Sequence, residues 1–289
     1  MHFSSITNFA TLAKAITQVE NSLAGFEETL MALQPQSIPV IGFTGPPGAG
    51  KSTLLNATVT QLLSEEKKVG LLLIDPSSPF NLGAILGDRL RLSAHFNHPN
   101  LFIRSIATRG SLGGLSHTIV EVLEVMKSYT FDYIFIETVG VGQSEVEIAG
   151  LADKTIVILV PEAGDSVQTM KAGIMEIADV FVVNKADRAD AESMVQALQT
   201  QLHLADKDYI PVIKTIAVEN SGITELISTF SEKTSVNENR KTQLLLSKAL
   251  TIIQREKMKH FDVSAFSRDL KEAVTMENFS LYRFVKKYF

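Results

Sequence analysis

Through the middle of the chain, short apolar runs alternate with stretches in which apolar residues recur at helical spacing. Some of the runs are apolar at every position, as from Leu71 to Ile74. A strand covered on both faces gives such an unbroken run, whereas a strand with one exposed face alternates apolar and polar residues. Buried strands separated by helical stretches predict βα units, and therefore an α/β fold with a mostly parallel central sheet and helices on both faces.

The periodicity assigns a position to each expected strand and helix. The expected strands are Val40–Thr44, Val69–Ile74, Leu101–Ile106, Tyr133–Glu137, Thr155–Val160, Val180–Asn184 and Pro211–Ile216. The expected helices lie near Lys51–Leu63, Gly114–Lys127, Ser166–Ile177, Ala189–Gln201 and Ser221–Phe230. In such folds the loops that follow the strands meet at one edge of the sheet, and ligands bind there.

The N-terminal end of the chain has a different pattern from the middle. Phe9, Leu12 and Ile16 recur at helical spacing, and the pattern stops at Pro35. Apolar residues at this spacing form one face of a helix, and proline ends it. Residues 1–36 are therefore expected to form an N-terminal helical arm.

The C-terminal end is also expected to be helical. Within residues 236–289, Leu246, Leu250 and Ile253 lie among basic residues, a pattern that can face a membrane or an acidic partner. Nearby acidic residues dilute this charge, which favours a helix packed on its own domain or on a second subunit. We expect residues 236–289 to be a helical extension that mediates dimerisation, and residues 37–235 to form the α/β domain.

Composition narrows the class of protein. The 289 residues carry 27 Lys and Arg against 32 Asp and Glu, and the resulting net charge of -5 disfavours nucleic acid as the main ligand. The chain has no cysteine, which excludes disulfides and thiolate metal sites. No stretch approaches the ~18 apolar residues of a membrane span, and the N-terminal stretch lacks an export signal. We expect a cytoplasmic protein that binds neither nucleic acid nor a membrane.

The segment after the first expected strand has the residues of a phosphate-binding loop. It fits the P-loop pattern with Gly45, Pro46, Pro47, Gly48, Ala49, Gly50, Lys51, Ser52 and Thr53. Glycines let consecutive backbone N–H groups point at phosphate oxygens, and the following helix contributes the positive end of its dipole. Lys51 is expected to reach the outer phosphates and the Ser52 hydroxyl to ligate Mg²⁺. The sequence thus predicts a P-loop NTPase.

A second motif predicts which base the bound nucleotide carries. Asn184, Lys185 and Asp187 follow an apolar strand. An Asp carboxylate accepts hydrogen bonds from N1–H and the amine of guanine, a donor pair that adenine lacks, so the motif favours GTP and GDP over adenine nucleotides. The stem of Lys185 can lie along the flat ring. A backbone N–H for the guanine oxygen is expected from the loop after the next strand, which contains Ile216, Ala217 and Val218.

Acidic residues at the ends of other expected strands predict a metal site. Mg²⁺ prefers one or two carboxylates, waters and substrate phosphates. Asp75 and Asp88 are candidate acids of the metal shell, directly or through water. Glu137 stands where most GTPases have Asp, and its extra methylene changes its reach. We expect Glu137 to orient or deprotonate the attacking water, with a place beside the metal as the alternative, and Gly140 to meet the γ-phosphate through its backbone N–H.

These segments resemble one family, the ArgK/MeaB-type G proteins. The resemblance covers roughly residues 10–230 and continues more weakly into the C-terminal helices. It is carried by GPPGAGKST (45–53), DPSSPF (75–80), GAILGDRLRL (83–92), HPN (98–100), TRGSLGGL (108–115), ETVGVGQSEVEIA (137–149) and EAGDSVQTMKAGIMEIADVFVVNKAD (162–187). The resemblance implies a GTPase of low intrinsic rate that acts as a chaperone of an adenosylcobalamin-dependent acyl-CoA mutase, such as methylmalonyl-CoA mutase. Nucleotide state would be coupled to cofactor loading and to protection of the mutase.

The resemblance also implies roles for individual segments. Asp75–Arg91 corresponds to a first switch, Glu137–Glu147 to a second, and Glu162–Lys171 to a third that senses the mutase. Lys171 is expected to contribute to catalysis when the partner presses on this third segment. Members of the family are typically homodimers, and their C-terminal helices supply much of the contact.

Two other functions are compatible with a P-loop. A metallochaperone GTPase that delivers nickel or zinc would be expected to carry a Cys motif or a His-rich tract, but the chain has no cysteine and its six histidines are scattered. A P-loop kinase would need residues that bind a phosphate acceptor, and none can be named from the sequence. Both alternatives are therefore weaker than a regulatory GTPase.

Overall fold

The computed structural model describes residues 6–75, 95, 97–107, 118–138, 144–161, 172–231, 237–259, 261–276 and 278–288. The chain divides into two compact units, Met1–Leu244 and Leu245–Phe289. The first unit contains the sheet, and the described part of the second is helical. The division into an arm, a domain and an extension at residues 36 and 235 stays a prediction.

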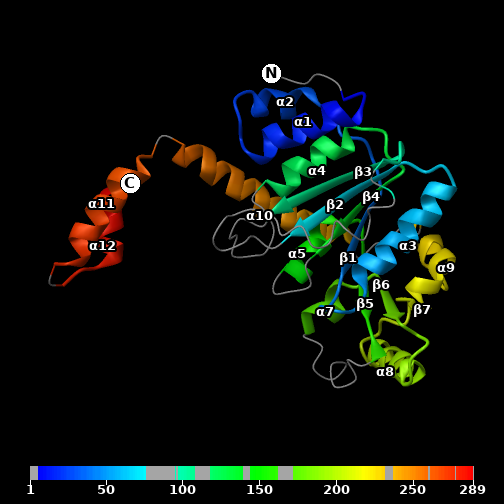
Figure 1. Ribbon diagram of the computed structural model, residues 1–289. Helices are drawn as coiled ribbons and strands as arrows, with labels where there is room; N and C mark the ends of the chain where they lie inside the picture. Colours follow the sequence, from blue (N-terminus) through cyan, green and yellow to red (C-terminus); the bar gives the residue numbers. More distant parts are fainter. Residues whose placement is uncertain are drawn as a thin grey trace. The chain divides into compact units, whose positions relative to one another are not determined.

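A seven-stranded sheet forms the centre of the first unit, with the strand order β3-β2-β4-β1-β5-β6-β7 (Figure 1). Its strands are β1 (Val40–Thr44), β2 (Val69–Asp75), β3 (Leu101–Ala107), β4 (Tyr133–Glu137), β5 (Lys154–Leu159), β6 (Val180–Asn184) and β7 (Val212–Thr215). Each neighbouring pair of these strands is parallel, which confirms the expected α/β fold. The central strand, β1, leads into the P-loop.

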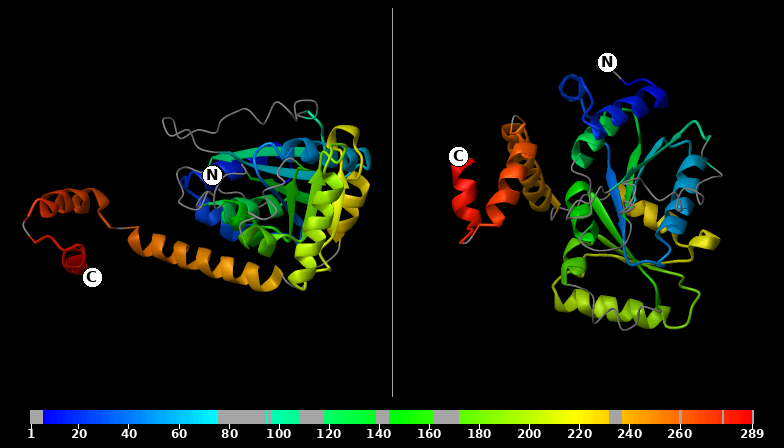
Figure 2. Two further views of the ribbon diagram at one scale, coloured as in Figure 1. Left: turned by 90° about the horizontal axis from the view of Figure 1, so that it is seen from below. Right: turned by 60° about the vertical axis from the view of Figure 1, so that its left-hand side comes forward.

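Helices cover both faces of this sheet (Figures 1 and 2). The helices α3 and α9 lie on one face, and α4, α5, α7 and α8 lie on the other, with α1 and α2 packed against α4. Their bounds are α1 (Phe9–Glu20), α2 (Phe26–Ala32), α3 (Lys51–Ser64), α4 (Ile119–Lys127), α5 (Ser144–Leu151), α7 (Ala172–Ile177), α8 (Ala191–Leu204) and α9 (Ile223–Ser228).

The strands send alternate side chains into hydrophobic cores on the two faces of the sheet. Ile41, Phe43 and Phe135 face α3, and the rings of Phe43 and Phe135 meet edge to face with centroids 5.4 Å apart. Val40 and Ile136, of opposite parity, face α1 and α4. Burial of each such side chain stabilises the fold by about 1.5–3 kcal/mol. Because helices cover both faces of the sheet, the strands need the unbroken apolar runs seen in the sequence.

Three aspartates close the amino edge of the sheet with a repeated arrangement. Each stands directly before a strand, its backbone N–H donates to a carbonyl at the start of a neighbouring strand, and its carboxylate accepts the N–H of that same residue. The carboxylate bonds join Asp132 to Lys68 (2.8 Å), Asp153 to Val40 (2.9 Å) and Asp179 to Thr155 (2.7 Å). Backbone donors that enter a buried strand need an acceptor, and these carboxylates provide it.

The N-terminal arm consists of two helices instead of one continuous stretch. Asn8 caps α1 by accepting the N–H of Thr11, and Gly25, with φ of 84°, is the N-cap of α2. Phe9 packs among aromatic rings, the nearest of them Tyr129 with centroids 5.2 Å apart. At the other end of α1, Glu20 forms an ion pair with Arg104 of β3. The arm is thereby fixed to the edge of the sheet that ends at β3.

Several element bounds differ from the sequence expectation. β7 begins at Val212, since Pro211 has no N–H to donate, and it ends before Ile216, which pairs with Ser221 in an isolated antiparallel bridge. The helix α5 was not expected from the periodicity. Parts of the expected helices at 114–127 and 166–177 lie outside the described residues.

The helices of the C-terminal region are α10 (Asn237–Met258), α11 (Val263–Val274) and α12 (Leu281–Val285), followed by a 3-10 turn. The second unit has a small aromatic core in which Phe266, Phe284 and Tyr288 contact one another. Large apolar side chains remain exposed in this unit, among them Leu246 at 60% and Leu250 at 51%. Within the described part of the chain, no helix combines the length and apolar character that a membrane crossing requires.

Candidate nucleotide site at the carboxyl edge of the sheet

Glycines allow the P-loop to turn tightly between β1 and α3. Gly45 has φ of 142°, and a Cβ atom there would lie 2.1 Å from the carbonyl oxygen of Ile158. Gly50 has φ of 84°, and its Cβ would lie 2.5 Å from the amide nitrogen of Asn184. Side chains at these two positions would clash and would also strain the backbone. The loop therefore depends on glycine for its course beside β5 and β6.

Lys51, the first residue of α3, is buried beneath the loop. Its Nζ donates to the carbonyl oxygens of Gly45 at 2.9 Å and Pro46 at 3.1 Å, which holds the ammonium group inside the curve of the loop. Gly50 stands at the N-cap of α3 and makes no side-chain capping bond. The first N–H groups of a helix lack intrahelical acceptors, so they and the ammonium group together suit an anion.

Ser52 and Glu137 are brought together from distant parts of the chain. The Ser52 hydroxyl donates to Glu137 Oε1 at 2.7 Å, and both residues are buried. The contact arises because β4 lies beside β1, in a register that pairs Glu137 with Phe43. A hydroxyl and a carboxylate next to a phosphate-binding loop are oxygen ligands of the type that Mg²⁺ prefers.

Asn184 joins the P-loop to the ends of β6 and β7. Its amide nitrogen donates to the carbonyl of Ala49 at 3.0 Å. Its oxygen accepts from the Thr215 hydroxyl at 3.0 Å and from the Ala217 N–H at 3.3 Å. Thr215 is buried and was missed in the sequence analysis; its position at the end of β7, directly before Ile216, was the available signal. These bonds orient the Asn184 amide and fix the two loops against each other.

The residues after Asn184 lie at the surface of the same edge. Lys185 has φ of 56° and its Nζ donates to the carbonyl of Gly48 at 2.9 Å, so its stem spans the space between the two loops. Asp187 is exposed, where a ligand can reach its carboxylate. Ala217 is buried and begins a 3-10 turn, whereas Val218 is 79% exposed. The residues predicted to read the base thus share one edge with the P-loop.

Some predicted site residues lie outside the described part of the chain. Asp88, Gly140 and Lys171 are among them. The backbone of Asp75 ends β2 at the same edge as Glu137, and its side chain is not described. Their roles stay predictions.

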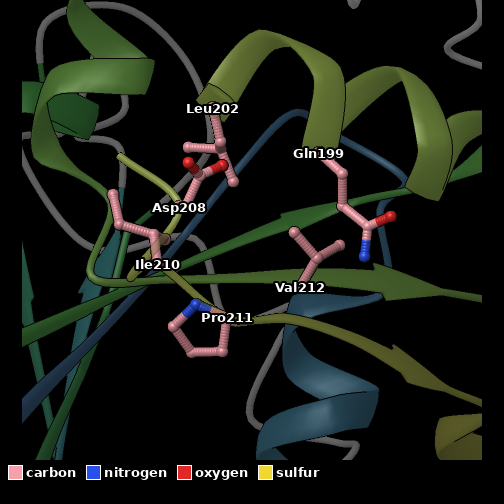
Figure 3. A pocket seen from close by; sticks show the side chains of 6 residues that line it. All are labelled: Gln199, Leu202, Asp208, Ile210, Pro211 and Val212. Carbon is pink, nitrogen blue, oxygen red and sulfur yellow. The ribbon is translucent and has the colours of Figure 1, made fainter. Parts of the chain in front are cut away.

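A separate cavity of about 180 Å³ lies at the other edge of the sheet (Figure 3). Residues of α8 and of the segment that enters β7 line it, namely Gln199, Leu202, Asp208, Ile210, Pro211 and Val212. It shares no residue with the predicted nucleotide site, which lies where the strands end. The predicted nucleotide site is instead formed by the loops that surround Lys51.

Comparison with known families identifies a match over most of the chain. The model of the family described as methylmalonyl-CoA mutase-associated GTPase MeaB matches residues 12–265. This range includes the P-loop, Glu137 and Asn184–Asp187.

Individual relatives agree with the family match. A Pyrococcus abyssi protein named as a GTPase is 46% identical over 222 residues, which are 74% of this chain and 68% of the relative. The GTPase ArgK of Escherichia coli is 36% identical and aligns with 75% of this chain and 70% of its own. The mitochondrial methylmalonic aciduria type A homolog of Mus musculus is 36% identical, over 77% of this chain and 59% of its own. A crystal structure described as a LAO/AO transport system kinase has a TM-score of 0.66 and 26% identity, and it covers 96% of this chain and 91% of that one.

Proposed function

This chain belongs to the methylmalonyl-CoA mutase-associated GTPases of the MeaB type, and on that premise we propose that its GTP hydrolysis controls the assembly, cofactor loading and protection of an adenosylcobalamin-dependent acyl-CoA mutase. Membership of this family means that the chain binds GTP and GDP and hydrolyses GTP. Methylmalonyl-CoA mutase is the partner that the family description favours.

One observation best supports the proposal: in this chain of the family, hydrogen bonds join the P-loop to the loops that are predicted to read the base. Asn184 contacts both Ala49 and Ala217, and Lys185 contacts Gly48, so a change at the phosphates is connected by direct bonds to the loops around the base. Such an arrangement suits a protein whose output is its nucleotide state. Hydrolysis then changes how the protein binds its partner.

We infer that Ser52 and Glu137 would hold Mg²⁺, since the donor set fits: two oxygen ligands lie 2.7 Å apart beside the P-loop. The bound ion would offset the charge of the phosphates. Glu137 would then serve the metal more directly than the attacking water. With Glu137→Gln, we expect a smaller gain in GDP affinity on addition of Mg²⁺. A normal gain with slower hydrolysis at saturating Mg²⁺ would assign Glu137 to the water instead.

The mutase proposal is tested by single-turnover GTP hydrolysis with and without a purified adenosylcobalamin-dependent mutase. GTPases that lack a positioned catalytic cation hydrolyse slowly, and supplying the cation raises the rate by ~10³–10⁵-fold. We expect slow basal hydrolysis that methylmalonyl-CoA mutase accelerates. An unchanged rate with every candidate mutase would contradict the proposal, and transfer of labelled phosphate to an acceptor other than water would favour the kinase alternative.

Lys171 is proposed to couple the partner to the site. The chain resembles family members in which the segment 162–171 senses the mutase, and a cation brought toward the phosphates would speed hydrolysis. Lys171→Ala should leave basal hydrolysis and nucleotide affinity unchanged and reduce the acceleration by the mutase. Equal acceleration of wild type and variant would remove Lys171 from the mechanism.

We further propose that the chain forms a homodimer through its C-terminal helices. Leu246, Leu250 and Ile253 are at least half exposed, and large exposed apolar groups usually mark a contact surface. The double variant Leu246→Glu, Leu250→Glu should convert a dimer to a monomer in sedimentation analysis. Leu204→Glu, at a 73% exposed leucine of α8, is the matched control and should leave the oligomeric state unchanged.

A further inference from the structure

Thr44 and Thr138 meet directly beside the P-loop and Glu137. Thr44 is the last residue of β1 and precedes Gly45, and Thr138 follows Glu137 at the end of β4. The Thr138 hydroxyl donates to the Thr44 hydroxyl at 3.0 Å, and the Thr138 N–H donates to the carbonyl of Phe43 at 3.1 Å. Each residue is only 1% exposed. The two bonds extend the pairing of β4 with β1 one residue beyond Glu137.

The threonine pair and the Ser52–Glu137 pair lie on opposite faces of the sheet. Successive side chains of a strand point to opposite faces. Phe43 and Phe135 face α3, so Glu137 does as well, and it meets Ser52 of that helix there. Thr44 and Thr138 therefore point to the face covered by α4 and α5. The end of β4 is held to β1 on one face by the threonines, and its carboxylate is held by Ser52 on the other.

We propose that Thr44 and Thr138 are positioning residues for Glu137. Their buried bond fixes the end of β4 against the strand that enters the P-loop, so that the Glu137 carboxylate stays at the Ser52 hydroxyl. Ligands held in advance by neighbouring hydrogen bonds bind a metal more tightly, because less ordering is needed when the metal arrives. This inference rests on the proposed role of Ser52 and Glu137 toward Mg²⁺.

The test measures the affinity for a fluorescent GDP analogue in excess Mg²⁺ and in EDTA, for the wild type and for Thr138→Val. Loss of one hydrogen bond corresponds to about three- to tenfold in an equilibrium constant. We expect the Mg²⁺-dependent gain in affinity to fall by this factor in Thr138→Val while the affinity in EDTA is unchanged. Thr138→Ser keeps the hydroxyl and should restore the gain, and Thr44→Val should reproduce the loss from the other strand.

A double variant separates positioning from stability. In Thr44→Val, Thr138→Val both hydroxyls are replaced by groups of the same shape, a change that can be nearly neutral for folding. We expect its thermal midpoint to be close to that of the wild type, with the Mg²⁺-dependent gain still reduced. Thr58→Val is the matched control, because Thr58 is also buried and its hydroxyl donates to the carbonyl of Leu54 within α3; its gain should equal that of the wild type.

The outcomes distinguish failure of this inference from failure of the proposed Mg²⁺ role of Ser52 and Glu137, on which it rests. If the valine variants keep the full gain, or if Thr58→Val loses it equally, the threonines are structural and the inference is wrong. If the wild type shows no gain with Mg²⁺, the proposed metal role of Ser52 and Glu137 fails. If only the variants of Thr44 and Thr138 reduce the Mg²⁺-dependent gain in affinity, the result supports both the inference and the proposed metal role.

Discussion

The two ends of strand β6 carry the same acidic side chain in different surroundings. Asp179, before the strand, is buried and binds the backbone of Thr155 through both its carboxylate and its N–H. Asp187, after the strand, is exposed, and Lys185, two residues before it, donates to the carbonyl of Gly48 in the P-loop. One carboxylate is used by the fold, and the other is exposed and is predicted to bind the guanine base. The amino edge of the sheet is closed by its own side chains, and the carboxyl edge carries the predicted nucleotide site.

Two buried lysines repeat this contrast. Lys51, at the carboxyl edge, donates to carbonyls of the P-loop, and a phosphate can compete for its ammonium group. Lys154, at the amino end of β5, donates to the carbonyl of Thr229, next to Phe230 of the core. Burial alone therefore does not identify a functional lysine. The edge on which it lies decides its role.

The largest expected effect is on hydrolysis at the carboxyl edge. Lys51→Ala removes a positive charge from the phosphate site, and loss of one preorganised donor typically costs about 10²–10³-fold in rate. We expect single-turnover hydrolysis to fall by at least about 10²-fold while the thermal midpoint changes little. Lys154→Met should do the opposite, with lower stability and nearly normal hydrolysis per folded molecule. Equal effects of the two variants on hydrolysis would contradict the division between edges.

The next largest effect is expected on the affinity for guanine nucleotides. Asp187→Asn removes the charge and replaces one of the two acceptor oxygens with an amide donor, so one guanine donor loses its acceptor, and a hydrogen bond to a charged group is worth about 1.5–3 kcal/mol. Calorimetric titration should show GTP binding weakened by about 10–100-fold, with improved binding of xanthosine triphosphate, whose ring carries an oxygen in place of the amine. The wild type should prefer GTP over ATP by at least ~10³-fold. Similar GTP and ATP affinities in the wild type would refute the assignment of Asp187.

A smaller effect on stability is expected at the amino edge. Asp179→Ala leaves the buried N–H of Thr155 without its carboxylate acceptor, which costs about 1–3 kcal/mol. Denaturant unfolding should show this loss in the free energy of unfolding, whereas GDP affinity of the folded protein should stay within about twofold. A variant with normal stability and weakened GDP binding would place Asp179 in the functional site.

The smallest effect is expected at Asp132, which uses the same bonding pattern at the surface. Its side chain is 41% exposed, so water can replace the carboxylate as acceptor for the Lys68 N–H. Asp132→Ala should lower the free energy of unfolding by no more than about 0.5–1 kcal/mol. A loss as large as that of Asp179→Ala would show that burial does not set the contribution of these aspartates.

Much of the nucleotide site could be predicted from local sequence. The P-loop depends on glycines at fixed spacing, and the structure shows why Gly45 and Gly50 tolerate no side chain. Unbroken apolar runs predicted the parallel strands because both faces of the sheet are covered. Thr215 was missed because a single threonine at a strand end has no distinctive pattern, and α5 was missed because it has no clear amphipathic periodicity.

The sequence by itself determined that the chain is an α/β P-loop protein with a guanine-reading motif, because glycine spacing, strand hydrophobicity and short motifs are properties of contiguous residues. The tertiary structure decided that β4 lies beside β1, and with it the contacts of Ser52 with Glu137 and of Thr44 with Thr138. It also decided that Asp179 is buried and used by the fold, whereas Asp187 is exposed. These contacts join residues far apart in the chain, and they depend on strand order and register, which arise only when the whole sheet packs between its helices.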